Sequence, residues 1–126
     1  LFRSRLVNFA SASAVQAFLP NGGTPDKLPV GPTSNPTSKT IKNTLAGQAV
    51  AATLNLALSP GLAPATVQSG VFAGYTAQQL LDAANAALGG AAITKTGLSD
   101  LTLNLGYLNA SFENRISTGF LACSDQ

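Results

Sequence analysis

The five carboxylates are the residues of this sequence that could carry the widest range of chemistry. Two carboxyl groups facing one cleft can act as general acid and general base, and several oxygen ligands close together can hold a metal ion. Their spacing indicates neither arrangement, and no Asp-x-Asp cluster occurs. We therefore expect no carboxylate pair and no metal site. The five are Asp26, Asp82, Asp100, Glu113 and Asp125.

Two short segments have weak likenesses to sites that use lysine. The segment Gly89–Thr96 (GGAAITKT) has a Lys-Thr pair after two glycines, but a phosphate-binding loop needs a glycine directly before the lysine and a helix after it. Here Thr94 precedes Lys95, so we interpret the segment as a helix end and a turn. Ser38 and Lys39 could form a nucleophile pair, but adjacent side chains in a loop or a first turn point in different directions.

The sequence has no His and a single Cys, Cys123. The absence of His removes the commonest general base and metal ligand. One Cys cannot build a zinc ribbon, an iron–sulfur site or a disulfide within the chain. Cys123 has two interpretations. It can form a disulfide bridge to another chain or to a missing part of this one, or it can be a small buried hydrophobic residue. The residue types predict no enzyme and no cofactor.

Charge is sparse, because 10% of the 126 residues are charged against roughly a quarter in a typical soluble domain. Seven Lys and Arg residues spread along the chain cannot form the basic stripe that nucleic acids need, so we expect no nucleic-acid partner. No apolar run reaches the roughly 18 residues of a membrane span, so we expect no transmembrane segment. The chain starts at Leu1 and not at Met, which favours a processed extracellular chain over a fragment that begins at an arbitrary residue. Arg3 and Arg5 interrupt the first apolar run, so no signal peptide is visible.

The first half of the chain predicts a strand, a short helix, a loop and a long helix. Residues 1–10 are typical of a strand, or of an arm that adds to a neighbouring sheet. A short helix is expected within 11–19. Residues 20–40, the Pro-rich segment, hold five of the seven prolines and predict a loop rich in Pro, Gly, Ser and Thr. Apolar spacing predicts the longest helix over 38–58.

The second half predicts two further helices. Thr76 and Gln79 have the spacing of a capping box, and Gly89-Gly90 ends that helix. The last helix is expected to start at Ser99, with Asp100 in its first turn. A short strand is expected within residues 62–75, between the long helix and the helix that Thr76 caps.

The tail 119–126 is expected to form a strand beside the N-terminal one. The predicted fold is mainly α, with three to four helices and a small β element formed by the terminal segments. We expect an N-terminal strand or arm at 1–10 and a single compact domain at 11–126.

Four segments resemble, in the same order, a module of secreted bacterial cell-surface proteins. They are Ala14–Leu28 (AVQAFLPNGGTPDKL), Ala46–Asn55 (AGQAVAATLN), Ala84–Gly90 (ANAALGG) and Leu98–Phe112 (LSDLTLNLGYLNASF). The resemblance implies an exported extracellular or cell-surface module with no catalytic residues to carry over. The last helix is more apolar than the pattern, and an extra apolar face needs something to cover it.

We therefore expect a secreted structural subunit that self-associates into an extracellular filament or surface layer, as a homo-oligomer or homopolymer. The low charge supports this expectation, because isolated domains normally depend on charged surface for solubility. The predicted assembly contacts are Phe2, Leu6, Val7, Phe9, Leu101, Leu105, Leu108 and Phe112.

The alternative is a cell-surface adhesion module that binds a glycan or matrix ligand through the Pro-rich segment. Asn109-Ala110-Ser111 matches an N-glycosylation sequon, but it falls on a predicted helix, where such a triplet can arise by chance.

Overall fold

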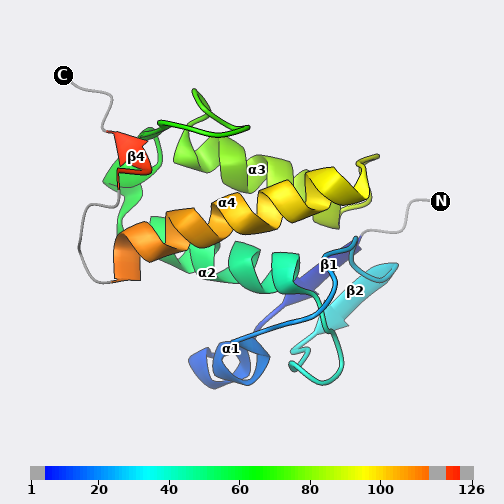
Figure 1. Cartoon of the computed structure of the whole chain (residues 1–126). Coiled ribbons are helices and arrows are strands. Elements are labelled where there is room, and N and C mark those ends of the chain that lie inside the picture. Colours follow the sequence, from blue (N-terminus) through cyan, green and yellow to red (C-terminus); the bar gives the residue numbers. More distant parts are fainter. Residues whose placement is uncertain (1–4, 114–118, 123–126) are drawn as a thin grey trace.

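The computed structural model describes residues 5–113 and 119–122, and this part of the chain contains four α-helices and two pairs of short strands. Three helices pack against one another in the centre (Figure 1), with α1 on the side of α2. The expectation of a mainly α fold with a small β element is confirmed. The helices are α1 (Ala12–Phe18), α2 (Thr44–Leu58), α3 (Ala77–Leu88) and α4 (Lys95–Glu113), with a 3₁₀ turn at Pro60–Leu62.

The start of α3 has the predicted capping box. The Thr76 hydroxyl accepts the N–H of Gln79 at 3.0 Å, and the Gln79 side chain accepts the N–H of Thr76 at 2.9 Å. These two bonds satisfy backbone donors that the first helical turn leaves without partners. Gly89 and Gly90 follow the last turn of α3, as expected.

Two helices start elsewhere than expected, because their caps lie elsewhere. Helix α2 begins at Thr44, where the Asn43 side chain accepts the N–H of Ala46 at 3.1 Å. Helix α4 begins four residues before Ser99, and the Thr94 hydroxyl accepts a backbone N–H of its first turn at 2.9 Å. Asp100 therefore lies beyond the first turn of α4.

The core lies where α2, α3 and α4 face one another. Leu45, Leu80 and Leu105, one from each helix, are fully buried. Phe18 of α1 is also fully buried, and its ring centroid lies 5.3 Å from that of Phe9, so both ends of α1 join the same core. Burial of each such side chain stabilises the fold by about 1.5–3 kcal/mol.

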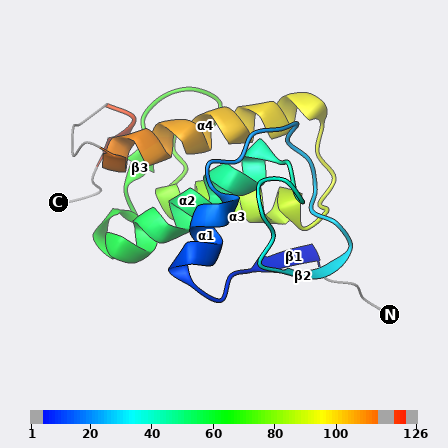
Figure 2. The same cartoon turned by 90° about the horizontal axis from the view of Figure 1, so that it is seen from below.

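The four strands form two separate sheets. Strand β1 (Arg5–Asn8) pairs in parallel with β2 (Gly31–Ser34), and β3 (Thr66–Val67) pairs antiparallel with β4 (Leu121–Ala122). The expectation that the C-terminal strand lies beside the N-terminal one is wrong. Figure 1 and Figure 2 show β1 (blue) and β4 (red) at opposite ends of the helices. Each terminal strand pairs instead with an internal segment.

The Pro-rich segment contains the strand β2, where the sequence predicts only an ordered or semi-ordered loop, and the segment is anchored to the helices. Its buried Leu28 donates a backbone N–H to the Leu88 carbonyl oxygen at 2.8 Å. The buried Asn21 side chain accepts the N–H of Asn43 at 2.7 Å, and the Asn43 side chain donates to the Asp26 carbonyl oxygen at 2.6 Å. These bonds hold the segment against the end of α3 and the start of α2.

Candidate functional site

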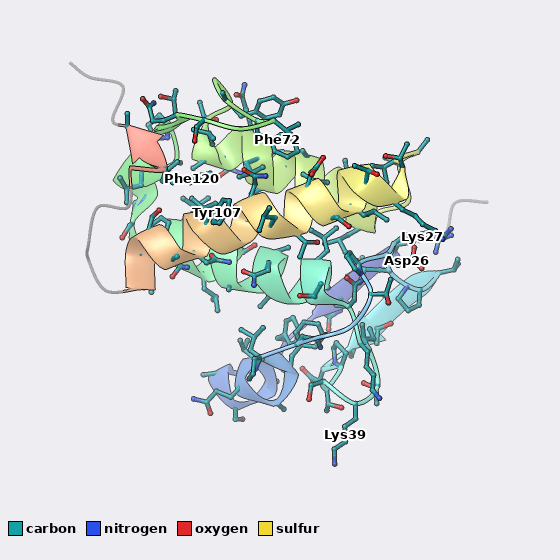
Figure 3. The ribbon with its side chains drawn as sticks, viewed as in Figure 1. Asp26, Lys27, Lys39, Phe72, Tyr107 and Phe120 are labelled. Atoms are coloured by element: carbon teal, nitrogen blue, oxygen red, sulfur yellow. The ribbon has the colours of Figure 1, made fainter. Side chains whose placement is uncertain are left out.

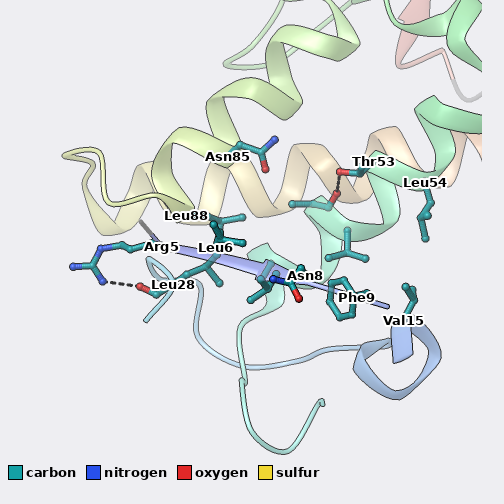
Figure 4. Close-up of a pocket in the computed structure, with 14 residues that line it drawn as sticks. Arg5, Leu6, Asn8, Phe9, Val15, Leu28, Thr53, Leu54, Asn85 and Leu88 are labelled. Atoms are coloured by element: carbon teal, nitrogen blue, oxygen red, sulfur yellow. Dashed lines mark hydrogen bonds between the residues drawn. The ribbon is translucent and has the colours of Figure 1, made fainter. Parts of the chain in front are cut away.

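A groove of about 570 Å³ lies between β1 and α2, and we call it the β1–α2 groove (Figure 4). Its lining is mostly aliphatic, with Val7 on one side and Val50 on the other. Leu6 and Leu54 also line it and are 40% and 42% exposed. Exposed leucines beside an apolar groove are typical of a surface that another molecule covers.

The groove follows the length of β1. Five consecutive residues, Arg5 to Phe9, line it, although successive side chains of a strand point to opposite faces. The groove therefore runs along the strand and is lined by residues from both of its faces, not from one face alone.

The polar groups in this groove do not form a reactive set. Arg5 is the only charged residue among the described residues that line it, and the Arg5 guanidinium donates to the Leu28 carbonyl oxygen at 2.6 Å (Figure 4). The Thr53 hydroxyl donates to the Ala49 carbonyl oxygen at 2.7 Å. These lining groups include no general base or carboxylate, so the groove can bind apolar groups but offers no acid–base pair.

A second apolar surface lies beside α3, and we call it the Val71–Ile93 patch. It surrounds a shallow hollow of about 370 Å³, in which Val71 is 70% exposed and Ile93 41% exposed. Asp100 is its one charged lining residue. Figure 3 labels Phe72 of this patch above α3, whereas β1 lies below α2.

A third surface is a cleft of about 490 Å³ formed by residues 24–29 and 40 of the Pro-rich segment, residues 41–43 directly before α2, and Arg5 of β1. Arg5, Lys27 and Lys42 line it together with one carboxylate, Asp26. We call it the basic cleft. Its positive charge makes it suited to an anionic ligand.

A fourth surface, a groove of about 540 Å³ between α1, α2 and α4, is lined by amide side chains. The Asn109 amide donates to the Gln48 side chain at 2.7 Å, and its oxygen accepts from Asn55 at 2.9 Å. Both ends of the Asn109 side chain therefore serve to join α2 and α4. This arrangement supports a chance origin for the sequon.

The seven predicted assembly contacts that lie within the described residues separate into three groups. Leu101, Leu105 and Leu108 are buried in the core of this chain, so the prediction that they contact other subunits is wrong. Their common face is covered by α2 and α3.

Three of the remaining contacts, Val7, Phe9 and Phe112, are partly buried and pack against the core. Leu6 is exposed, as an assembly contact should be. Phe2 and Cys123 lie outside the described residues.

The other candidates for chemistry are dispersed. Asp82 accepts a hydrogen bond from Gln78 at 2.9 Å on the exposed side of α3. Lys95 is the first residue of α4, so a helix does begin at this lysine, but α3 and a turn precede it where a phosphate loop has a strand. The Lys39 N–H donates to the Thr37 hydroxyl at 3.3 Å. In the ranges 5–113 and 119–122, no group of three or more His, Cys, Asp and Glu could hold a metal ion.

No protein-family model, curated protein or solved structure matches the chain. Among the helices that the structure describes, none is long and apolar enough to cross a bilayer. The surfaces described above are therefore the basis on which a function can be argued.

Sequence reasoning missed the basic cleft and the Val71–Ile93 patch. The three cations of the cleft are far apart in the sequence, and only the folding of the Pro-rich segment against β1 and α2 brings them together. The patch likewise joins two short connections on either side of α3. Neither surface leaves a local spacing signal in the sequence.

Proposed function

We propose that this chain is a secreted, cell-surface structural module without catalytic activity, which associates with copies of itself into a filament or surface layer. The observation that supports this best is the pair of separate apolar surfaces, the β1–α2 groove and the Val71–Ile93 patch, which share no residue. The location rests on the resemblance to secreted bacterial surface modules.

The two surfaces are suited to each other. Each is mainly apolar, and among their described lining residues the one charged residue of each has opposite sign, Arg5 in the groove and Asp100 in the patch. When the groove of one copy contacts the patch of the next, the resulting row of copies has a free patch at one end and a free groove at the other. Unlike surfaces in contact generate a ring or an open filament, which fits a polymer-forming subunit.

Two single variants and one control test this arrangement. Leu54→Asp places a charge in the groove and Val71→Asp places one in the patch, whereas Leu103→Asp places the same charge on an exposed position of α4 (53% exposed). We expect the wild-type chain and the Leu103 variant to form particles that grow with concentration, and each of the other two to remain monomeric. Sedimentation velocity and electron microscopy measure both properties.

Mixing the groove variant with the patch variant separates this contact from a symmetric one. Each variant retains one intact surface, so an equimolar mixture should form a dimer that grows no further. A wild-type chain that stays monomeric at high concentration contradicts self-association. A patch variant that still forms dimers by itself contradicts the groove-to-patch contact.

The second candidate function, adhesion to a glycan or matrix ligand through the Pro-rich segment, is favoured by the basic cleft. Four consecutive residues of the segment, Asp26 to Pro29, line the cleft, and hydrogen bonds to Leu88 and Asn43 hold this wall in place. A wall that is already ordered loses less conformational entropy when a ligand binds.

Filling this cleft tests the second function. Thr24 lines the cleft and is exposed, so Thr24→Trp should block it without disturbing the core. Thr96→Trp is the matched control on an exposed position of α4. We expect the wild-type chain and the control to bind at least one of dextran, polygalacturonate, dextran sulfate and collagen in pull-down assays, and the cleft variant to lose that binding. Equal binding by all three proteins would place the ligand site elsewhere.

A further inference from the structure

We infer that the basic cleft binds acidic sugar units, which carry a carboxylate or a sulfate, within an extracellular polysaccharide. The inference rests on the second proposed function, adhesion through the Pro-rich segment, and specifies its ligand class. It concerns a side of the molecule formed by β1, the Pro-rich segment and the start of α2.

The cations of the described chain are concentrated in this cleft. Arg5, Lys27 and Lys42 line it, whereas Lys39 and Lys95 are the other two Lys or Arg residues in the described ranges. Figure 3 shows Lys39 projecting away from Lys27. In a chain with so few charges, three cations around one hollow create a local positive potential.

Within residues 5–113 and 119–122, neither Lys27 nor Lys42 is in an ion pair. The single carboxylate of the cleft, Asp26, accepts the backbone N–H of Lys27 at 2.8 Å. An anionic ligand would therefore meet two ammonium groups that have no ion-pair partner in the part of the chain that the structure describes.

The walls of the cleft are fixed before a ligand arrives. Arg5 uses one of its N–H donors to bind the Leu28 carbonyl oxygen at 2.6 Å, which places the guanidinium at the junction of β1 and the Pro-rich segment. On the other side, Asn43 donates to the Asp26 carbonyl oxygen. The remaining guanidinium N–H groups are suited to a carboxylate or sulfate, since their planar fork matches such oxygens.

Size and lining favour a sugar over other anionic macromolecules. The volume of about 490 Å³ lies within the roughly 300–1,000 Å³ of small-molecule sites. Among the described residues no aromatic side chain lines the cleft, so these residues offer no platform on which nucleic-acid bases could stack. The exposed Thr24 adds a hydroxyl group that can bond to sugar hydroxyls.

The test compares two double variants of equal net charge in the full chain. Lys27→Gln with Lys42→Gln removes two cleft cations, and Lys39→Gln with Lys95→Gln removes two cations elsewhere. Binding is measured by isothermal titration calorimetry with polygalacturonate, dextran sulfate and neutral dextran. We expect the cleft variant to bind the acidic polymers at least about tenfold more weakly than wild type, and the control variant to change by less than about twofold. The two acidic polymers distinguish carboxylate from sulfate as the recognised group.

All four lysines are exposed, so we expect both double variants to fold. Circular dichroism spectra that match that of the wild type would show this. Equal weakening in the two double variants would overturn the inference, because net charge alone would then explain binding. Tighter binding of anionic phosphatidylglycerol vesicles or of single-stranded DNA than of both acidic polymers would overturn it as well. A third outcome is that neither acidic polymer binds, while dextran or collagen does bind and Thr24→Trp abolishes that binding. This outcome would overturn the inference of an acidic ligand, but it would leave the proposal of adhesion through the Pro-rich segment standing. If none of the glycans and no collagen binds, both fail.

Discussion

Gly23 shows how one residue can determine whether the basic cleft forms. Its φ of +144° lies in the region that favours glycine, and a Cβ atom there would lie 2.7 Å from the carbonyl carbon of Lys42. The backbones of Gly23 and Lys42 therefore approach closely beside the cleft, and the N–H of Thr44 donates to the Gly23 carbonyl oxygen at 3.2 Å. The neighbouring Gly22 has no atom within 4 Å of such a Cβ and has no such φ.

We expect Gly23→Ala to lower the free energy of unfolding by about 1–3 kcal/mol, because the added methyl group is placed against fixed backbone at a strained φ. Gly22→Ala is the matched control and should change it by no more than about 0.5 kcal/mol. Urea unfolding followed by circular dichroism measures both values. Equal stabilities of the two variants would show that the approach of Gly23 to Lys42 is not needed for the fold.

Helix α4 shows what apolar spacing reveals and what it leaves open. The recurrence of Leu101, Leu105 and Leu108 on one face correctly predicts an amphipathic helix. The same spacing does not say whether that face is covered by another part of the chain or by another subunit. In the structure α2 and α3 cover it, and the face that remains open carries Leu103 and Tyr107.

We therefore expect Leu105→Ala to lower the free energy of unfolding by about 2–5 kcal/mol, as large-to-small changes in a core do. Leu103→Ala removes the same atoms from an exposed position of the same helix and should cost about 0.5 kcal/mol or less. Thermal and urea unfolding of dilute protein measure the difference. If the Leu105 variant were as stable as the Leu103 variant, Leu105 would not contribute to the core, and its face of α4 would again be a candidate assembly contact.

Other elements were predictable to the extent that their determinants are local. The capping box of α3 consists of Thr76 and Gln79, which are three residues apart, so the sequence locates it. The start of α2 depends on Asn43, whose side chain is also held by a bond to Asp26, 17 residues away. Strand β2 depends on pairing with β1, and its Gly-Pro start has little strand character of its own.

At the scale of the whole molecule, the candidate sites were less predictable than the fold. The sparse charge of the sequence predicts uncharged surfaces, and the β1–α2 groove and the Val71–Ile93 patch each have one charged lining residue. Packing between helices that are distant in the sequence decides which apolar residues stay on the surface. The apolar pattern of the sequence therefore does not distinguish Leu54 and Val71 from core residues. The basic cleft depends on the path of the Pro-rich segment, which its many turn-forming residues do not specify.

The two small sheets also determine how the module would respond to tension. Strands β1 and β4 lie at opposite ends of the helices, and each is attached to an internal strand (Figure 1). A pulling force applied between residues 5 and 122 is thus transmitted through the β1–β2 and β3–β4 pairs and across the helical core. The β3–β4 pair has only two residues in each strand against four in β1–β2, so the C-terminal attachment is the one that should yield first under load.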